Sequence, residues 1–91
     1  DSKYIDMKNN VERDIGIFFV DAGRMSDAIQ FYESNGINYT QQFVKIATMI
    51  VSQGRFSQAE QLLNEAAKSE KDRDRKITIY LAQLDLFDKY N

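Results

Sequence analysis

Residues 22–29 read Ala-Gly-Arg-Met-Ser-Asp-Ala-Ile, and residues 53–60 read Gln-Gly-Arg-Phe-Ser-Gln-Ala-Glu. Both segments contain the pattern Gly-Arg-apolar-Ser, and Gly23 and Gly54 occupy the same place in the two copies. A segment that returns at a spacing of roughly 20 to 50 residues, as this one does, is typical of helical repeat proteins. We therefore expect one helical unit to occur twice. Repeat arrays usually present binding surfaces rather than catalytic chemistry.

The composition of the 91 residues argues against several classes of protein. Hydrophobic residues make up 43% of the chain, which is enough for a modest core. The net charge of −2 gives no electrostatic reason to expect a nucleic acid as a partner. The sequence has no histidine and no cysteine, which removes disulfides, thiol nucleophiles and most zinc chemistry. We therefore expect no enzyme, no cofactor and no bound metal.

The sequence also lacks the signals of a membrane protein. Its longest apolar runs, such as residues 46–51, are much shorter than the roughly 20 residues that cross a bilayer. The given sequence does not open with a basic segment followed by an apolar one, so we expect neither a signal peptide nor a membrane anchor in it. The default expectation is a cytoplasmic, intracellular protein without a membrane partner.

Apolar residues recur at steps of three and four along five segments, which predicts an all-α chain. The sequence contains no proline, and three of its four glycines stand where helices are expected to end. The first helix is expected over about residues 9–22, and the second ends near residue 35. The third ends at Gly54, and the fifth follows a charged stretch at residues 68–76.

Three polar residues are expected to cap helices at their amino ends. Ser26, Asn38 and Ser57 each precede an apolar periodic segment, and residues of this type accept hydrogen bonds from free backbone amides. Gln41 and Glu60 follow Asn38 and Ser57 by three residues, which completes the capping-box pattern.

Glu70, Asp72 and Asp74 alternate in a way that could suggest a calcium loop. Basic residues stand between these carboxylates, and the stretch has neither a turn glycine nor a closing glutamate. We therefore expect a charged, solvated linker between two helices at this place.

The positions around the repeated segment identify a family. Gly16 lies seven residues before Gly23, and Ala28 and Tyr32 follow Gly23 by five and nine residues. The second copy has Ala47 where the first has Gly16. Through these positions the chain resembles the tetratricopeptide repeat. The resemblance covers nearly the whole sequence as one domain, with degenerate copies at about residues 9–37, 38–71 and 72–91. It implies an α-solenoid of antiparallel helix pairs with about two and a half repeats.

The resemblance also implies that the first helix of each pair lines a concave surface, where this family usually holds peptides. Nine residues are expected on that surface: Arg13, Ile17, Val20, Val44, Lys45, Thr48, Val51, Arg75 and Ile79. The two arginines resemble the charge of a carboxylate-binding site, but isoleucines stand where such a site needs polar residues. An apolar or helical segment is therefore the expected ligand. Alternatively, these residues pack against further helices of a longer array.

Two functions follow from this interpretation. The first is a non-catalytic scaffold that binds a protein or peptide on its concave face. The alternative is a structural α-solenoid segment of a large assembly subunit, such as a transport or coat scaffold, without a peptide groove.

The fifth helix favours that alternative, because it carries more apolar residues than one face against the preceding helix can cover. These residues are Ile77, Tyr80, Leu81, Leu84 and Phe87. We expect this helix to self-associate or to be covered by another helix or subunit.

Overall fold

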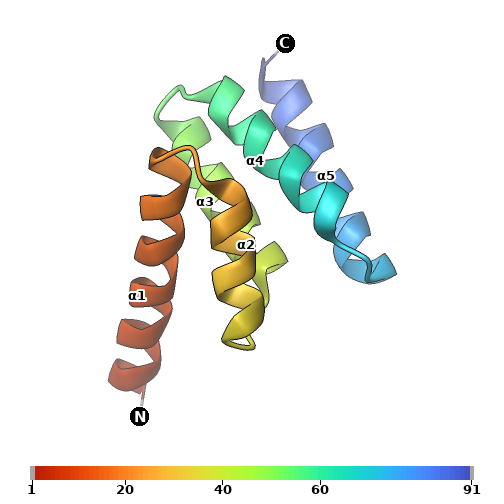
Figure 1. Ribbon diagram of the computed structural model, residues 1–91. Helices are drawn as coiled ribbons and strands as arrows, with labels where there is room; N and C mark the ends of the chain where they lie inside the picture. The colour runs from red at the N-terminus through yellow and green to blue at the C-terminus, as the bar shows by residue number, and fades with distance from the viewer. Residues whose placement is uncertain (1, 91) are drawn as a thin grey trace.

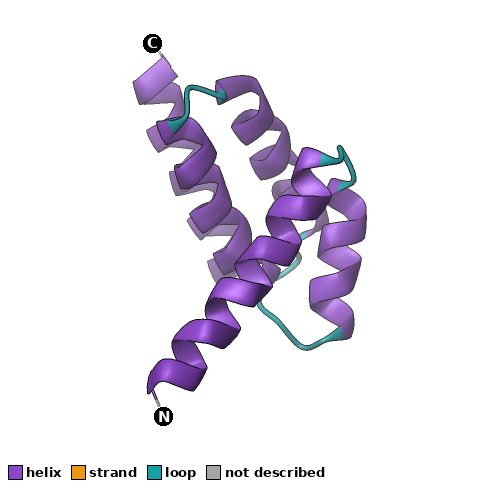
Figure 2. Ribbon diagram, turned by 90° about the vertical axis from the view of Figure 1, so that its left-hand side faces the viewer, coloured by secondary structure: helices purple, strands orange, loops and turns teal. Residues whose placement is uncertain are grey.

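The computed structural model describes residues 2–90, and helices are the only regular secondary structure in this range (Figures 1 and 2). Its five helices are α1 (Ser2–Asp21), α2 (Met25–Ser34), α3 (Tyr39–Ser52), α4 (Phe56–Ser69) and α5 (Arg73–Tyr90). Loops of three or four residues connect them. The expected all-α class is thereby confirmed.

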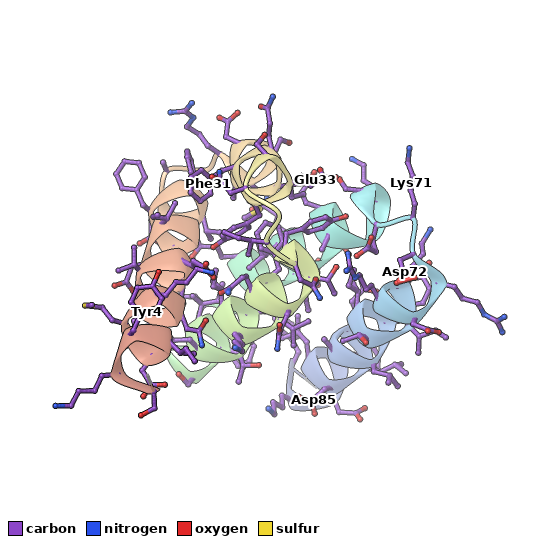
Figure 3. All side chains as sticks on the ribbon, turned by 90° about the horizontal axis from the view of Figure 1, so that it is seen from below. Tyr4, Phe31, Glu33, Lys71, Asp72 and Asp85 are labelled. Atoms are coloured by element: carbon purple, nitrogen blue, oxygen red, sulfur yellow. The ribbon has the colours of Figure 1, made fainter. Side chains whose placement is uncertain are left out.

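The helices lie in two rows. Figure 3, which looks along the helices, shows α1, α3 and α5 side by side in one row and α2 and α4 in the second. Consecutive helices run in opposite directions (Figure 1), so that α1 with α2 and α3 with α4 form antiparallel pairs. α3 packs against α1 and α5 in its own row and against α2 and α4 in the other. These packed pairs agree with a helical repeat.

Gly23 and Gly54 end α1 and α3 with the same backbone conformation. Their φ angles are +72° and +79°, in the left-handed region that glycine adopts without a steric penalty. The reversal that follows each glycine carries the chain from the first row to the second. The expected helix ends at both glycines are therefore confirmed.

The hydrogen bonds around these two turns repeat as well. The Arg24 amide donates to the Phe19 carbonyl oxygen at 2.8 Å, and the Arg55 amide donates to the Ile50 carbonyl oxygen at 3.0 Å. Donor and acceptor stand at matching positions of the two copies, in a pattern that satisfies carbonyls at a helix end. The repeat seen in the sequence is thus a repeat of backbone geometry.

Of the three expected caps, only Asn38 is confirmed. Its Oδ1 accepts a hydrogen bond from the Gln41 amide at 3.3 Å. The expectation for Ser26 and Ser57 was wrong, because α2 and α4 begin one residue earlier and both serines lie inside the first turn. Arg24 and Arg55 occupy the cap positions, and neither donates or accepts a side-chain capping hydrogen bond.

Two helices are longer than expected. α1 begins at Ser2, where a Lys8–Glu12 pair at 3.5 Å supports the added turns at spacing i, i+4. α5 begins at Arg73, because the charged stretch forms its first turn and the Lys76 amide donates to the Asp72 carbonyl oxygen at 2.9 Å.

The core lies between the two rows and is centred on α3. Ala28 and Ala59 are completely buried, as their small size at the helix crossings predicts. The largest fully buried side chains come from every helix of the fold: Val20, Tyr32, Phe43, Ile46, Ile50, Leu62, Leu63 and Ile79. Phe19 and Phe56 are partly buried against this core.

The closest packing occurs where Tyr32 passes over Gly16. The Tyr32 hydroxyl donates to the Glu12 carbonyl oxygen at 2.6 Å, and burial raises the pKa of Tyr32 to about 12. A Cβ atom at Gly16 would collide with the Tyr32 hydroxyl oxygen and lie 2.8 Å from Ile46 Cδ1. Gly16 is therefore small because a buried tyrosine occupies the space above it.

We predict that Gly16→Ala destabilises the fold, although alanine is the better helix former by about 1 kcal/mol. Overpacking against Tyr32 and Ile46 typically costs ~1–3 kcal/mol and should exceed that gain. Urea unfolding followed by circular dichroism measures the difference. The cost should shrink in the Tyr32→Phe background, where the colliding oxygen is absent. Equal costs in both backgrounds would remove Tyr32 as the cause.

Candidate interaction surfaces

The nine residues expected on the concave surface do not form one continuous site. Val20 and Ile79 are 1% and 0% exposed, because their side chains belong to the core between the rows. They present no surface to a partner, and the expectation that they contact a ligand is corrected. Ile17 is partly buried and packs against the same core.

Arg13 and Arg75 are engaged elsewhere. The Arg13 guanidinium lies 3.3 Å from the carboxylate of Asp14, its neighbour on α1. The Arg75 guanidinium lies 3.8 Å from the Asp72 carboxylate at the start of α5. Each arginine thus has a carboxylate of this chain beside it, and the two do not line a common cavity.

Three of the four expected α3 residues, Val44, Thr48 and Val51, line a small hollow between α3 and α5, and Lys45 lies outside it. Val44 and Val51 are half-buried, whereas Lys45 and Thr48 are exposed. The Thr48 hydroxyl donates to the Val44 carbonyl oxygen at 3.0 Å, so it is already satisfied by its own helix. Besides Val44, Thr48 and Val51, the lining residues are Ala47, Leu63, Ala82, Asp85, Leu86 and Lys89.

The size of this hollow limits what it can hold. Its volume is about 100 Å³, well below the roughly 300 Å³ at which small-molecule pockets begin. A Lys89–Asp85 ion pair at 3.1 Å stands at its edge. The hollow can take one apolar side chain of a partner, but it cannot take a helix.

A buried carboxylate lies at the other end of the bundle, between α4 and α5. Glu70 is only 6% exposed, and its Oε1 accepts a hydrogen bond from the Thr40 hydroxyl at 2.5 Å. Its Oε2 accepts bonds from the Lys71 and Asp72 amides at 3.1 and 3.4 Å. The prediction of a solvated linker is therefore wrong at Glu70. This residue joins the loop at 70–72 to the first turn of α3.

The surroundings of Glu70 make it a structural group. Tyr39, at the start of α3, is the neighbour of this carboxylate. Burial of Tyr39, followed by the nearby Glu70 and Glu33 carboxylates, raises the pKa of Tyr39 to about 12. Within residues 2–90 no three metal-ligating side chains come together, at Glu70 or elsewhere. The carboxylate fixes the junction between the second helix pair and α5.

We predict that Thr40→Val destabilises the fold by ~1–3 kcal/mol, because a buried carboxylate loses a hydrogen-bond donor. Thr40→Ser keeps the hydroxyl and should cost less. The matched control is Thr78→Val, since Thr78 is exposed and its hydroxyl donates only to the Asp74 carbonyl oxygen of its own helix at 3.2 Å. Urea midpoints of the three variants compare these sites. If the two valine variants cost the same, the bond to Glu70 contributes nothing.

The most prominent surface feature is the placement of exposed apolar side chains. Every large apolar residue that is strongly exposed in residues 2–90 lies on α1 or α5, the two end helices of the first row (Figure 3). On α1 these are Tyr4, Ile5, Met7, Val11 and Phe18, and on α5 they are Ile77, Tyr80, Leu81, Leu84, Phe87 and Tyr90. None of them lies on α2, α3 or α4.

We define the α5 outer face as Ile77, Tyr80, Leu81 and Leu84, which are 45–61% exposed. The opposite side of the helix is apolar as well, because Ile79 and Leu86 are buried. The expected excess of apolar surface on this helix is thus present. This surplus apolar surface lies on the side of α5 opposite Ile79 and Leu86, which pack against the core.

We define the α1 outer face as Tyr4, Met7, Val11 and Phe18. The first three are exposed by 51–63% and Phe18 by 67%. Their steps of three, four and seven residues place them on one side of the helix. Sequence reasoning missed this face because it began the helix at about residue 9, beyond Tyr4 and Met7.

Comparison with family models, with curated proteins and with solved structures finds no match for this chain. None of the helices described is long and apolar enough to cross a membrane. The function must therefore be inferred from the geometry of these surfaces.

Proposed function

We propose that the chain is a non-catalytic α-solenoid segment of the tetratricopeptide-repeat kind, which makes protein–protein contacts through its two end helices. The observation that carries this proposal is the confinement of strongly exposed apolar residues to α1 and α5. Large exposed apolar patches on a folded protein mark contacts with proteins or membranes, or ligand-binding grooves. The lack of histidine and cysteine in the sequence supports a role without catalysis.

The energetics indicate what kind of partner suits these faces. Complete burial of a large apolar side chain is worth about 1.5–3 kcal/mol, so covering a half-exposed one gives roughly 1 kcal/mol. The four residues of the α5 outer face would together offset only the lower end of the ~4–15 kcal/mol that association costs. A partner must therefore cover more than one row of side chains, as a helix or a helix pair does.

A second function is favoured by the hollow between α3 and α5. Its apolar floor, made by Ala47 and Leu63, would accept one anchoring side chain of a peptide bound along α3. Val44 and Thr48 at the entrance would then contact that peptide. This is the concave-surface binding expected from the family resemblance, reduced to a single anchor.

The two functions predict opposite behaviour in affinity capture with the immobilised chain. We predict that Leu81→Lys with Leu84→Lys abolishes capture of a specific protein, whereas Val44→Glu with Thr48→Lys retains it. Gln30→Lys with Gln61→Lys, at exposed positions of α2 and α4, is the control for added charge. Because Leu81 and Leu84 are 61% exposed, their replacement should leave the circular dichroism spectrum unchanged.

The opposite pattern, with loss only in the α3 variant, would favour the hollow. Equal capture by all variants would contradict both functions. The melting temperature of each variant separates loss of binding from loss of folding, and this matters most for the half-buried Val44.

A further inference from the structure

The contact between the two helix pairs indicates what kind of surface would pack against each end helix. The Ile46 side chain of α3 faces α1, because its Cδ1 lies against Gly16. Gln42 and Met49 lie one turn before and after Ile46 on the same side of α3. Gln42 is only 6% exposed and Met49 is partly buried. This side of α3 is therefore the surface that packs on the preceding helix of the row.

The corresponding surface exists on α1, where two of its three residues are strongly exposed and the third, Ile15, is half-buried. When the two copies are aligned on Gly23 and Gly54, the residues that match Gln42, Ile46 and Met49 are Val11, Ile15 and Phe18. Val11 and Phe18 are 51% and 67% exposed, and they belong to the α1 outer face. The α1 outer face thus corresponds to an interface that is already formed once within this chain.

The contact between the two helix pairs also includes polar interactions. The Arg55 guanidinium binds the Asp21 carboxylate at 2.7 Å, and the Gln58 side chain donates to the Val20 carbonyl oxygen at 3.2 Å. In this way the second helix pair holds the carboxyl end of α1. Arg24 is the counterpart of Arg55 in the first copy, and it pairs at 2.6 Å with Asp27, in its own helix pair.

The other end of the array offers a complement. α5 is the last helix of the first row, opposite α1 (Figure 3), and its outer face is apolar. Near its carboxyl end α5 carries the exposed Asp88, which follows Leu84 of the α5 outer face by one turn. The chain therefore has two apolar end faces with opposite charges near them: Arg24 follows the helix that carries the α1 outer face, and Asp88 lies beside the α5 outer face.

We propose that two copies of this chain associate head to tail, with the α5 outer face of one copy on the α1 outer face of the next. Arg24 of the second copy would then bind Asp88 of the first, as Arg55 binds Asp21 within one copy. This inference rests on the proposed role of the end helices and names their partner. Such a contact joins two different surfaces, so it leaves one face free at each end and permits further addition.

A symmetric contact between two α5 helices fits these observations less well. It would leave the α1 outer face uncovered. Head-to-tail contact covers both faces and pairs opposite charges.

The test uses two blocked variants of the purified chain. The head-blocked variant is Val11→Glu with Phe18→Lys, and the tail-blocked variant is Leu81→Lys with Leu84→Glu. In a sedimentation concentration series the native chain should grow continuously beyond a dimer, whereas each variant alone should stay monomeric. An equal mixture of the two variants should form dimers and nothing larger, because each supplies the face that the other lacks. Circular dichroism confirms that both variants fold.

Three outcomes would overturn the proposal: a native chain that stays monomeric, a head-blocked variant that still dimerises, or a mixture that stays monomeric. The second would indicate contact between two α5 helices. A monomeric native chain whose capture of another protein still depends on Leu81 and Leu84 would remove the second copy as the partner. The proposed function would then stand with a different protein on the same face.

Charge exchange tests the polar contact separately. Arg24→Glu should weaken association by at least about fivefold, because attraction becomes repulsion at an exposed site. Adding Asp88→Arg in the same chain restores opposite charges across each contact and should recover the native affinity. A double variant as weak as Arg24→Glu alone would show that these two residues do not meet.

Discussion

The burial of α3 between the two rows is the constraint on which the rest of the structure depends. α3 packs against all four other helices, while α1 and α5 lie on opposite sides of it in the same row. Phe43, Ile46 and Ile50 are completely buried, so this helix supplies much of the core. Because α3 is covered on nearly every side, its exposed side chains are limited to Gln41, Lys45, Thr48 and Ser52, and Val44 and Val51 are half-buried. A broad peptide groove therefore has little room on this helix, and the hollow beside it is small.

The positions of α1 and α5 at the two ends of the first row explain why these helices differ from α3. Each first-row helix of an array has a preceding and a following neighbour, and its side chains are apolar on both sides. For α3 both neighbours are present, whereas among residues 2–90 α1 has none before it and α5 has none after it. The exposed apolar residues of α1 and α5 thus lie on sides that no other helix covers within residues 2–90. This is the physical basis for the proposal that the end faces, rather than the concave face, contact a partner.

Polar contacts then determine how the helix pairs are held against one another. Arg55 with Asp21, together with Gln58 and the Val20 carbonyl, joins the pairs at one end of the bundle. Glu70 joins α3 to the start of α5 at the other, through Thr40. Both ties link residues at least 30 positions apart in the sequence. They resist sliding of one pair along the next, which apolar packing restrains less well because it has no direction.

The sequence by itself determined the local features of this protein. Helix periodicity, the Asn38 cap and the turns at Gly23 and Gly54 depend on neighbouring residues, so the all-α class and the repeat could be predicted. Only the tertiary structure decided which apolar stripe of α5 is buried, because Ile79 with Leu86 and Ile77 with Leu81 both fit a helical period. It also buried Val20 and Glu70 and exposed Val11 and Phe18. Burial depends on which helix lies opposite, and no spacing within a single helix specifies that neighbour.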